Sequence, residues 1–203
     1  MAITRMKKED RIQQIKDVTL SLISKKAISA IRTAEIARMA NVSEATLFKY
    51  FNNKEEIFES IIEQFINFEH PNVDYEDITT PQKFREYLNT YMSSLINIDN
   101  NRIAFLHLLL QISMDKHPLA IVKYNQTVNG FWNIMENRIE YGKLHWNFNK
   151  NFNTKIQVRL FLLSVLMFLI EQEVFDAKLQ DPFSLEKVKD TAIDNLFKLL
   201  IIK

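Results

Sequence analysis

The chain has 203 residues and a mass of 24.0 kDa, with 47% apolar and 25% charged residues, a balance that excludes disorder for the chain as a whole. With only 2 Gly and 4 Pro, the chain has few signals for the tight turns that sheets need, which favours helices. The lack of Cys excludes disulfides, thiolate nucleophiles and Cys-based zinc sites. The longest apolar stretch, Leu160–Ile170, is about half the roughly 20 residues of a membrane span. With no apolar secretory segment at the start either, we expect a cytoplasmic protein.

The charge is divided unevenly along the chain. Residues 1–54 hold 11 Lys and Arg against 5 Asp and Glu, a net charge of +6, and the remainder holds 15 against 20, a net charge of −5. A basic N-terminal part on an acidic body indicates a polyanionic partner for that part alone. A chance imbalance on a solvated surface is the alternative, and charge by itself does not separate the two.

Apolar residues at spacings of three and four predict a series of helices. In chain order they span about 5–26, 33–40, 43–50, 54–68, 81–98, 102–116, 118–142, 154–177 and 184–203. Thr33, Ser43 and Asn53 stand where helix N-caps are needed, and Asn41 suits a left-handed turn between the second and third helices. No alternating strand pattern is present, so we predict an all-α fold of about nine helices.

The second and third helices are short and separated by a turn of three to four residues, which is the pattern of a helix-turn-helix. Ile36, Ala37 and Leu47 fall where the two helices must touch, and Ala37 is small at their crossing. A purely structural helical hairpin fits the same spacing. From spacing alone, both interpretations stay open.

Residues 33–58 resemble the DNA-binding signature of TetR-family transcriptional regulators. The most specific part of the resemblance is Val42-Ser43-x-x-Thr46-Leu47-Phe48-x-Tyr50-Phe51-x-x-Lys54-Glu55. It implies a helix-turn-helix DNA-binding domain, 1–54, and a larger ligand-binding and dimerisation domain, 55–203, bridged by the helix at about 54–68. It also implies a ligand-responsive regulator, usually a repressor, that binds a palindromic DNA operator as a homodimer and is released by a small molecule. Phe48 departs from the family, which usually carries Tyr there.

In a helix-turn-helix, the N-terminal residues of the recognition helix meet base edges, while hydroxyls, amines and helix N-termini meet phosphates. We therefore expect DNA contacts from a set of residues around both short helices. These are Arg32, Thr33, Ser43, Glu44, Ala45, Thr46, Lys49, Tyr50 and Lys54. Glu44 brings negative charge towards DNA: it can accept from a cytosine amino group or interact with the helix dipole, and both readings stay open.

The last two predicted helices carry apolar stripes that one neighbour cannot bury, and this favours a homodimer with a four-helix interface. The candidate interface residues are Leu160, Leu163, Met167, Ile170, Val174, Val188, Ala192, Leu196 and Leu199. Packing within a single chain is the alternative, whereas the family resemblance also implies the dimer.

The body is rich in large apolar and aromatic side chains, most of which are expected to be core. Together they also suit an apolar cavity with a few polar groups, which predicts a largely apolar ligand. The candidate lining residues are Phe65, Tyr91, Phe105, His107, Leu108, Gln111, Ile112, Tyr124, Phe131, Trp132, Met135, Phe161 and Phe168.

Two other classes of function are an enzyme and a helical adaptor. For an enzyme, the four His show no metal-ligand spacing, and the sequence has no phosphate-binding glycine loop or nucleophile elbow, so we expect neither catalysis nor a cofactor. The remaining alternative is a helical adaptor or effector-binding protein with weakened DNA binding, to which Glu44, Ala34 and Phe48 lend some support.

Overall fold

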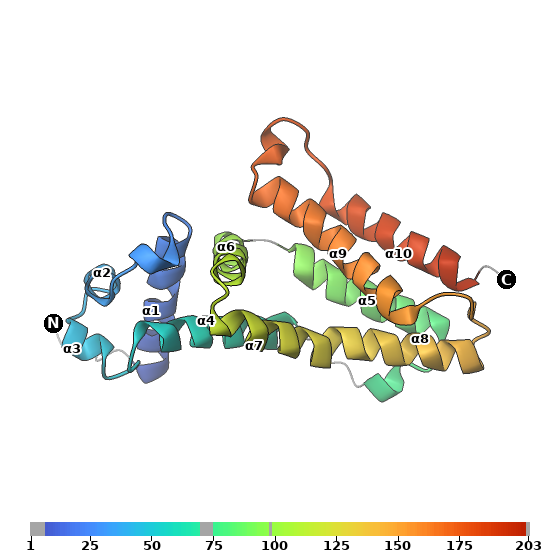
Figure 1. Cartoon of the computed structure of the whole chain (residues 1–203), viewed down its shortest axis with the longest axis horizontal. Coiled ribbons are helices and arrows are strands. Elements are labelled where there is room, and N and C mark those ends of the chain that lie inside the picture. The colour runs from blue at the N-terminus through green and yellow to red at the C-terminus, as the bar shows by residue number, and fades with distance from the viewer. Residues whose placement is uncertain (1–6, 70–74, 98, 202–203) are drawn as a thin grey trace. The chain divides into compact units, whose positions relative to one another are not determined.

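The computed structural model of the chain describes residues 7–69, 75–97 and 99–201, and these residues form helices without any strand (Figure 1). The α-helices are α1 (Lys8–Ile23), α2 (Thr33–Met39), α3 (Glu44–Leu47), α4 (Lys54–Glu69), α5 (Pro81–Ile96), α6 (Asn100–Met114), α7 (Pro118–Thr127), α8 (Asn133–His145), α9 (Thr154–Glu173) and α10 (Leu185–Ile201). Short helical turns are η1 (Ile28–Ala30), η2 (Tyr75–Asp77) and η4 (Ala177–Leu179). The predicted all-α fold is confirmed.

The predicted seventh helix is present as α7 and α8, joined by the π-helical segment η3 (Val128–Trp132). Gly130 within this segment has φ −90° and ψ −112°, outside helical values. A π-type turn inserts one extra residue into the hydrogen-bond pattern of a helix and kinks it. The single helix that the apolar spacing predicts is therefore divided into two.

Local sequence sets most of the helix starts. The Ser43 hydroxyl accepts the Thr46 N–H at 3.1 Å, and the Asn53 side chain accepts the Glu56 N–H at 2.8 Å, so these two predicted caps are confirmed. Asn41, with φ 53°, takes the expected left-handed turn. The predicted Thr33 cap is wrong: Arg32 occupies the cap position without a side-chain bond, and Thr33 is the first residue of α2.

One compact unit contains α1–α3, α4 to residue 67, α6 and the start of α7. Its core joins the inner faces of the short helices to those of α4 and α6, and α1 packs directly against α6. Ile15, Ile36, Leu47, Ile57 and Leu108 have no exposed surface. The two short helices therefore pack on a core to which α6, a segment distant in sequence, contributes.

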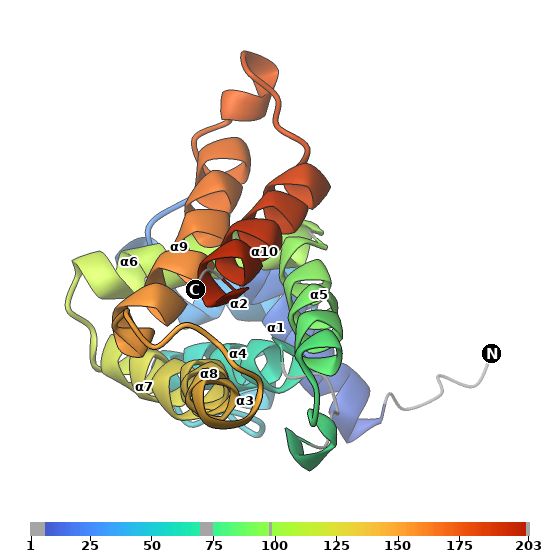
Figure 2. The ribbon, with the colours of Figure 1, turned by 90° about the vertical axis from the view of Figure 1, so that its right-hand side faces the viewer.

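The second compact unit contains α5, the rest of α7, α8, α9 and α10. α10 packs against both α5 and α9, and both views of the ribbon show α9 and α10 side by side (Figures 1 and 2). Phe84, Phe131, Met135 and Val165 are fully buried in this unit. No helix in the described ranges is long and apolar enough to cross a membrane.

The compact units do not follow the predicted division into residues 1–54 and 55–203. α6 is grouped with the short N-terminal helices because its apolar face completes their core. Packing alone does not say which segments fold or act independently, so the predicted functional boundary stays a prediction.

Candidate nucleic-acid interface and sites on the helical body

The short helix α3 is held by its own cap and by apolar residues on its inner side. The hydroxyls of Ser43 and Thr46 lie 2.9 Å apart, and the Ser43 oxygen also accepts the Thr46 N–H. Leu47 has no exposed surface and Phe51 only 4%. With one side fixed in this way, the residues between Ser43 and Phe51 present the opposite side to solvent.

That opposite side carries three of the predicted DNA-contacting residues. Glu44, Ala45 and Lys49 are exposed, and Phe48, which lies among them, is 45% exposed. We call these four residues the α3 face. It presents an acceptor, a methyl group, an aromatic ring and an ammonium, which are side-chain types that contact base edges in the major groove.

Thr33 and Glu44 meet across the helix-turn-helix. The Thr33 hydroxyl, on the first residue of α2, donates to Glu44 Oε2 at 2.9 Å. Both side chains are near the surface, and the bond joins the starts of α2 and α3. The cap of α3 is provided by Ser43, so the Glu44 carboxylate has a different hydrogen-bond partner.

Lys54 begins α4 and also holds the turn before α2. Its Nζ donates to the carbonyl oxygens of Ile28 and Ile31, each at 3.2 Å, and lies 5.8 Å from the centre of the Phe58 ring. The ammonium therefore satisfies two backbone acceptors of the chain itself. A phosphate contact from Lys54 remains a prediction, and any substitution here will also disturb η1.

The other predicted DNA-contacting residues flank this region. Arg32 is exposed immediately before α2, and Tyr50 is half-buried against the core of the first unit. Thr46 is half-buried and bonded to Ser43. Thus the predicted set occupies one connected stretch of the helix-turn-helix.

The candidate ligand-pocket residues are spread over both compact units. Phe65, Phe105, Leu108 and Ile112 belong to the core of the first unit, where the rings of Phe65 and Phe105 stack with centroids 4.3 Å apart. On α6 of the same unit lie His107, half-buried, and Gln111, whose Oε1 accepts the Ile28 N–H at 2.7 Å.

In the second unit, Tyr91 and Phe131 stack with centroids 3.7 Å apart, and the partly exposed Tyr124 meets the edge of Trp132. Met135 and Phe161 are buried in the same core, and Phe168 lies on α9. A cavity lined by the whole candidate set stays a prediction.

The outer surface of α9 carries an apolar stripe at helical spacing. Leu160, Leu163 and Met167 are 59%, 47% and 53% exposed, as a surface for a partner requires. Ile156, at 58%, extends the stripe by one turn and was missed, although its spacing of four from Leu160 gave the signal. We call these four residues the α9 stripe.

Of the other predicted interface residues, Leu196 is only 1% exposed and therefore has almost no surface for a partner. Those that are half-buried are Ile170, Val174, Val188, Ala192 and Leu199.

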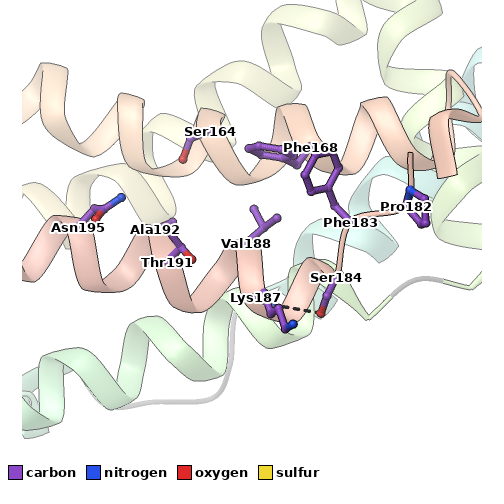
Figure 3. Close-up of a pocket in the computed structure, with 10 residues that line it drawn as sticks. All are labelled: Ser164, Phe168, Pro182, Phe183, Ser184, Lys187, Val188, Thr191, Ala192 and Asn195. Atoms are coloured by element: carbon purple, nitrogen blue, oxygen red, sulfur yellow. Dashed lines mark hydrogen bonds between the residues drawn. The ribbon is translucent and has the colours of Figure 1, made fainter. Parts of the chain in front are cut away.

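Beside this stripe, α9, α10 and the segment just before α10 line an open hollow of about 580 Å³ (Figure 3). Its lining is Ser164, Phe168, Pro182, Phe183, Ser184, Lys187, Val188, Thr191, Ala192 and Asn195. One end is fixed by the buried Gln172, whose Nε2 donates to the Asp181 carbonyl and whose Oε1 accepts the Phe183 N–H at 2.9 Å. Sequence reasoning did not find this hollow, because the contact between the loop and Gln172 has no periodic signal.

The N-terminal segment has a recognisable family. Residues 15–61 match the model for bacterial regulatory proteins of the tetR family. Over 52 residues the chain is 44% identical to YvkB of Bacillus subtilis strain 168, an HTH-type transcriptional regulator, and the match covers 26% of this chain and 28% of YvkB. A fatty acid metabolism regulator protein of the same organism is 26% identical over 140 residues, 66% of this chain and 69% of that protein.

Solved structures resemble the chain over nearly its whole length. NalD, the secondary repressor of the MexAB-OprM multidrug efflux pump in Pseudomonas aeruginosa, aligns with a TM-score of 0.68 at 18% identity and covers 96% of this chain and 98% of its own. FadR from Bacillus subtilis, solved in complex with stearoyl-CoA, aligns with a TM-score of 0.67 at 20% identity and covers 93% and 98%. At these identities the likeness establishes the fold.

Proposed function

We propose that the chain is a regulator of the tetR family, because residues 15–61 match the model for that family. In this proposal it represses transcription by binding a palindromic DNA operator as a homodimer, and it releases the DNA on binding a largely apolar small molecule. The observation that carries the proposal is the exposed α3 face on a firmly supported helix-turn-helix. As a DNA-binding regulator it would act in the cytoplasm.

DNA binding by the first unit is supported by charge as well as shape. The net charge of +6 over residues 1–54 suits a polyanion, and Lys49 is an exposed cation on the α3 face. In the proposed complex, the α3 face enters the major groove. Arg32, Tyr50 and Lys54 lie at its flanks and contact phosphates, which fix the position of α3 without reading sequence.

Dimerisation through α9 and α10 is supported by the α9 stripe and the hollow beside it. Four large apolar side chains at helical spacing are exposed on one helix, which costs free energy unless a partner covers them. In the proposed dimer, the stripe of one protomer lies against α9 and α10 of the other. Two recognition helices then meet half-sites about one DNA turn, roughly 34 Å, apart.

The proposed effector is a largely apolar small molecule. The aromatic and apolar candidate residues support a largely apolar small molecule, and the likeness to a FadR structure that holds stearoyl-CoA supports an acyl chain as a first compound to test. Such a ligand weakens DNA binding only if it has a higher affinity for the conformation that does not bind DNA.

The test is binding of the purified full-length protein to the DNA directly upstream of its own gene, beside shuffled DNA of the same length, near 150 mM salt. The proposal predicts selective binding that is weakened in Lys49→Ala and unchanged in Lys155→Ala, which replaces an exposed cation of α9. Equal and feeble binding to both DNAs, followed by a genome-wide selection without enriched fragments, would favour a helical adaptor instead.

A further inference from the structure

The side chain of Glu44 is the unusual member of the α3 face, because it places a carboxylate where a polyanion is to bind. It is exposed, and its Oε2 accepts the Thr33 hydroxyl at 2.9 Å. Ser43, not Glu44, caps α3. The carboxylate is thus left on the reading surface with one oxygen oriented by a neighbouring helix.

An ionised carboxylate can only accept hydrogen bonds, so the base it meets must donate. In the major groove the donors are the N4 amino group of cytosine and the N6 amino group of adenine. Adenine presents its N7 acceptor beside N6, and an acceptor facing a carboxylate is unfavourable. Cytosine is therefore the base whose edge fits Glu44.

We infer that Glu44 determines operator specificity by accepting from the amino group of one cytosine in each half-site, with Thr33 orienting the carboxylate. This inference rests on the proposed function and specifies the DNA sequence that the α3 face reads. Thr33 is a positioning residue in this arrangement, since it acts through Glu44.

The other residues of the α3 face should read base positions different from the one that Glu44 reads. Lys49, one turn further along, carries donors only and suits the acceptors of guanine. Ala45 is an exposed methyl group that suits the thymine methyl. A change at Glu44 should consequently alter one position of the bound sequence and leave the positions read by these residues in place.

The experiment is selection from a pool of randomised DNA duplexes by the full-length protein and its variants. The wild type is expected to enrich a motif with one invariant cytosine per half-site. Glu44→Gln should move that position from cytosine to adenine, because an amide pairs with adenine N6 and N7, and should lower affinity for the wild-type site about tenfold. Glu59→Gln, an equal change in charge at an exposed position of α4, should leave the motif unchanged.

Each other outcome counts against one part of the account. If wild type and Glu44→Gln enrich the same motif, Glu44 does not read a base and the inference is wrong while DNA binding stands. If neither wild type nor Glu59→Gln enriches any sequence, the proposed function fails and the inference fails with it. Thr33→Val should weaken discrimination at the cytosine position alone, and undiminished discrimination would contradict the orienting role of Thr33.

Discussion

Gln111 of α6 accepts the backbone N–H of Ile28 through its Oε1, at 2.7 Å, across 83 residues of sequence. Ile28 lies in η1, the turn that leads into α2, and its carbonyl oxygen accepts from Lys54. Side chains from α4 and α6 thus hold one turn of backbone. The position of the helix-turn-helix depends on this turn as well as on apolar packing.

Gln111→Met keeps the length of the side chain and removes the acceptor. The substitution leaves the Ile28 N–H without its acceptor. Because Ile28 has only 5% of its surface exposed, we expect the free energy of unfolding to fall by about 1–3 kcal/mol. Gln111→Glu, which retains an acceptor, should lose less. Urea unfolding of the three proteins measures this, and equal midpoints for wild type and Gln111→Met would contradict it.

Lys54→Met and Lys49→Ala separate support of the fold from contact with DNA. Lys54→Met removes the donor to the Ile28 and Ile31 carbonyls, so we expect lower stability together with a salt dependence of DNA binding reduced by about one phosphate contact. Lys49 is exposed, and Lys49→Ala should weaken DNA binding with unfolding unchanged. Urea unfolding and binding titrations at several salt concentrations distinguish the two. A destabilised Lys49→Ala would show that this assignment is wrong.

Leu163→Glu places a charge in the middle of the α9 stripe. Since Leu163 is 47% exposed in the single chain, we expect normal helicity but a protein that sediments as one chain of 24.0 kDa, whereas the wild type sediments at twice that mass. Leu144→Glu is the matched control, because Leu144 is a leucine that is 75% exposed on a different helix, α8. A Leu163→Glu dimer as stable as the wild type would place the interface elsewhere.

Gly142→Ala tests the close packing at the end of α8. A Cβ at this position would lie closer than 3.0 Å to ring carbons of Phe148 and Trp146, and overpacking of this kind costs about 1–3 kcal/mol. In a Phe148→Leu background the same substitution should cost less, because the smaller side chain leaves room. Thermal unfolding of the four proteins gives both costs, and identical costs would exclude the contact with the Phe148 ring as the cause.

Glu140 makes stability depend on acid. Hydrogen bonds from the Thr154 hydroxyl and from Lys143 Nζ, the latter at 3.0 Å, hold the pKa of the Glu140 carboxyl below its ordinary value. A carboxyl with a lowered folded-state pKa stabilises the fold above its ordinary pKa, and this contribution is lost as the pH falls through the folded-state value. Glu140→Gln should therefore show a shallower loss of stability below about pH 5, measured by unfolding against pH. A Glu140→Gln protein whose stability falls with acid as steeply as that of the wild type would contradict this role of Glu140.

Helix positions were predictable because they depend on neighbours in sequence. Ser43 and Asn53 cap their helices through atoms three residues away, and the exposed residues of α9 follow from spacing. Thr33 was expected to cap α2, but it is the first residue of that helix, and its hydroxyl donates to Glu44, eleven residues away. Contacts of this kind, and the longer one between Gln111 and Ile28, have no periodicity by which a sequence reveals them.

The candidate sites divide in the same way. The α3 face was predictable because its residues are consecutive and resemble a known signature. The hollow between α9 and α10 was not, because it is built by Gln172 holding a loop near Phe183. The candidate ligand-lining residues were chosen for size and aromaticity, and these properties serve cores and cavities equally.

The central claim is sequence-selective DNA binding by the first unit, and the most direct measurement is the affinity for the upstream DNA between 50 and 200 mM salt, with shuffled DNA in parallel. A protein that neutralises six phosphates should lose affinity by roughly 10³-fold across this range while it keeps its preference for the upstream DNA. Affinity that is weak, equal for both DNAs and insensitive to salt would contradict the account.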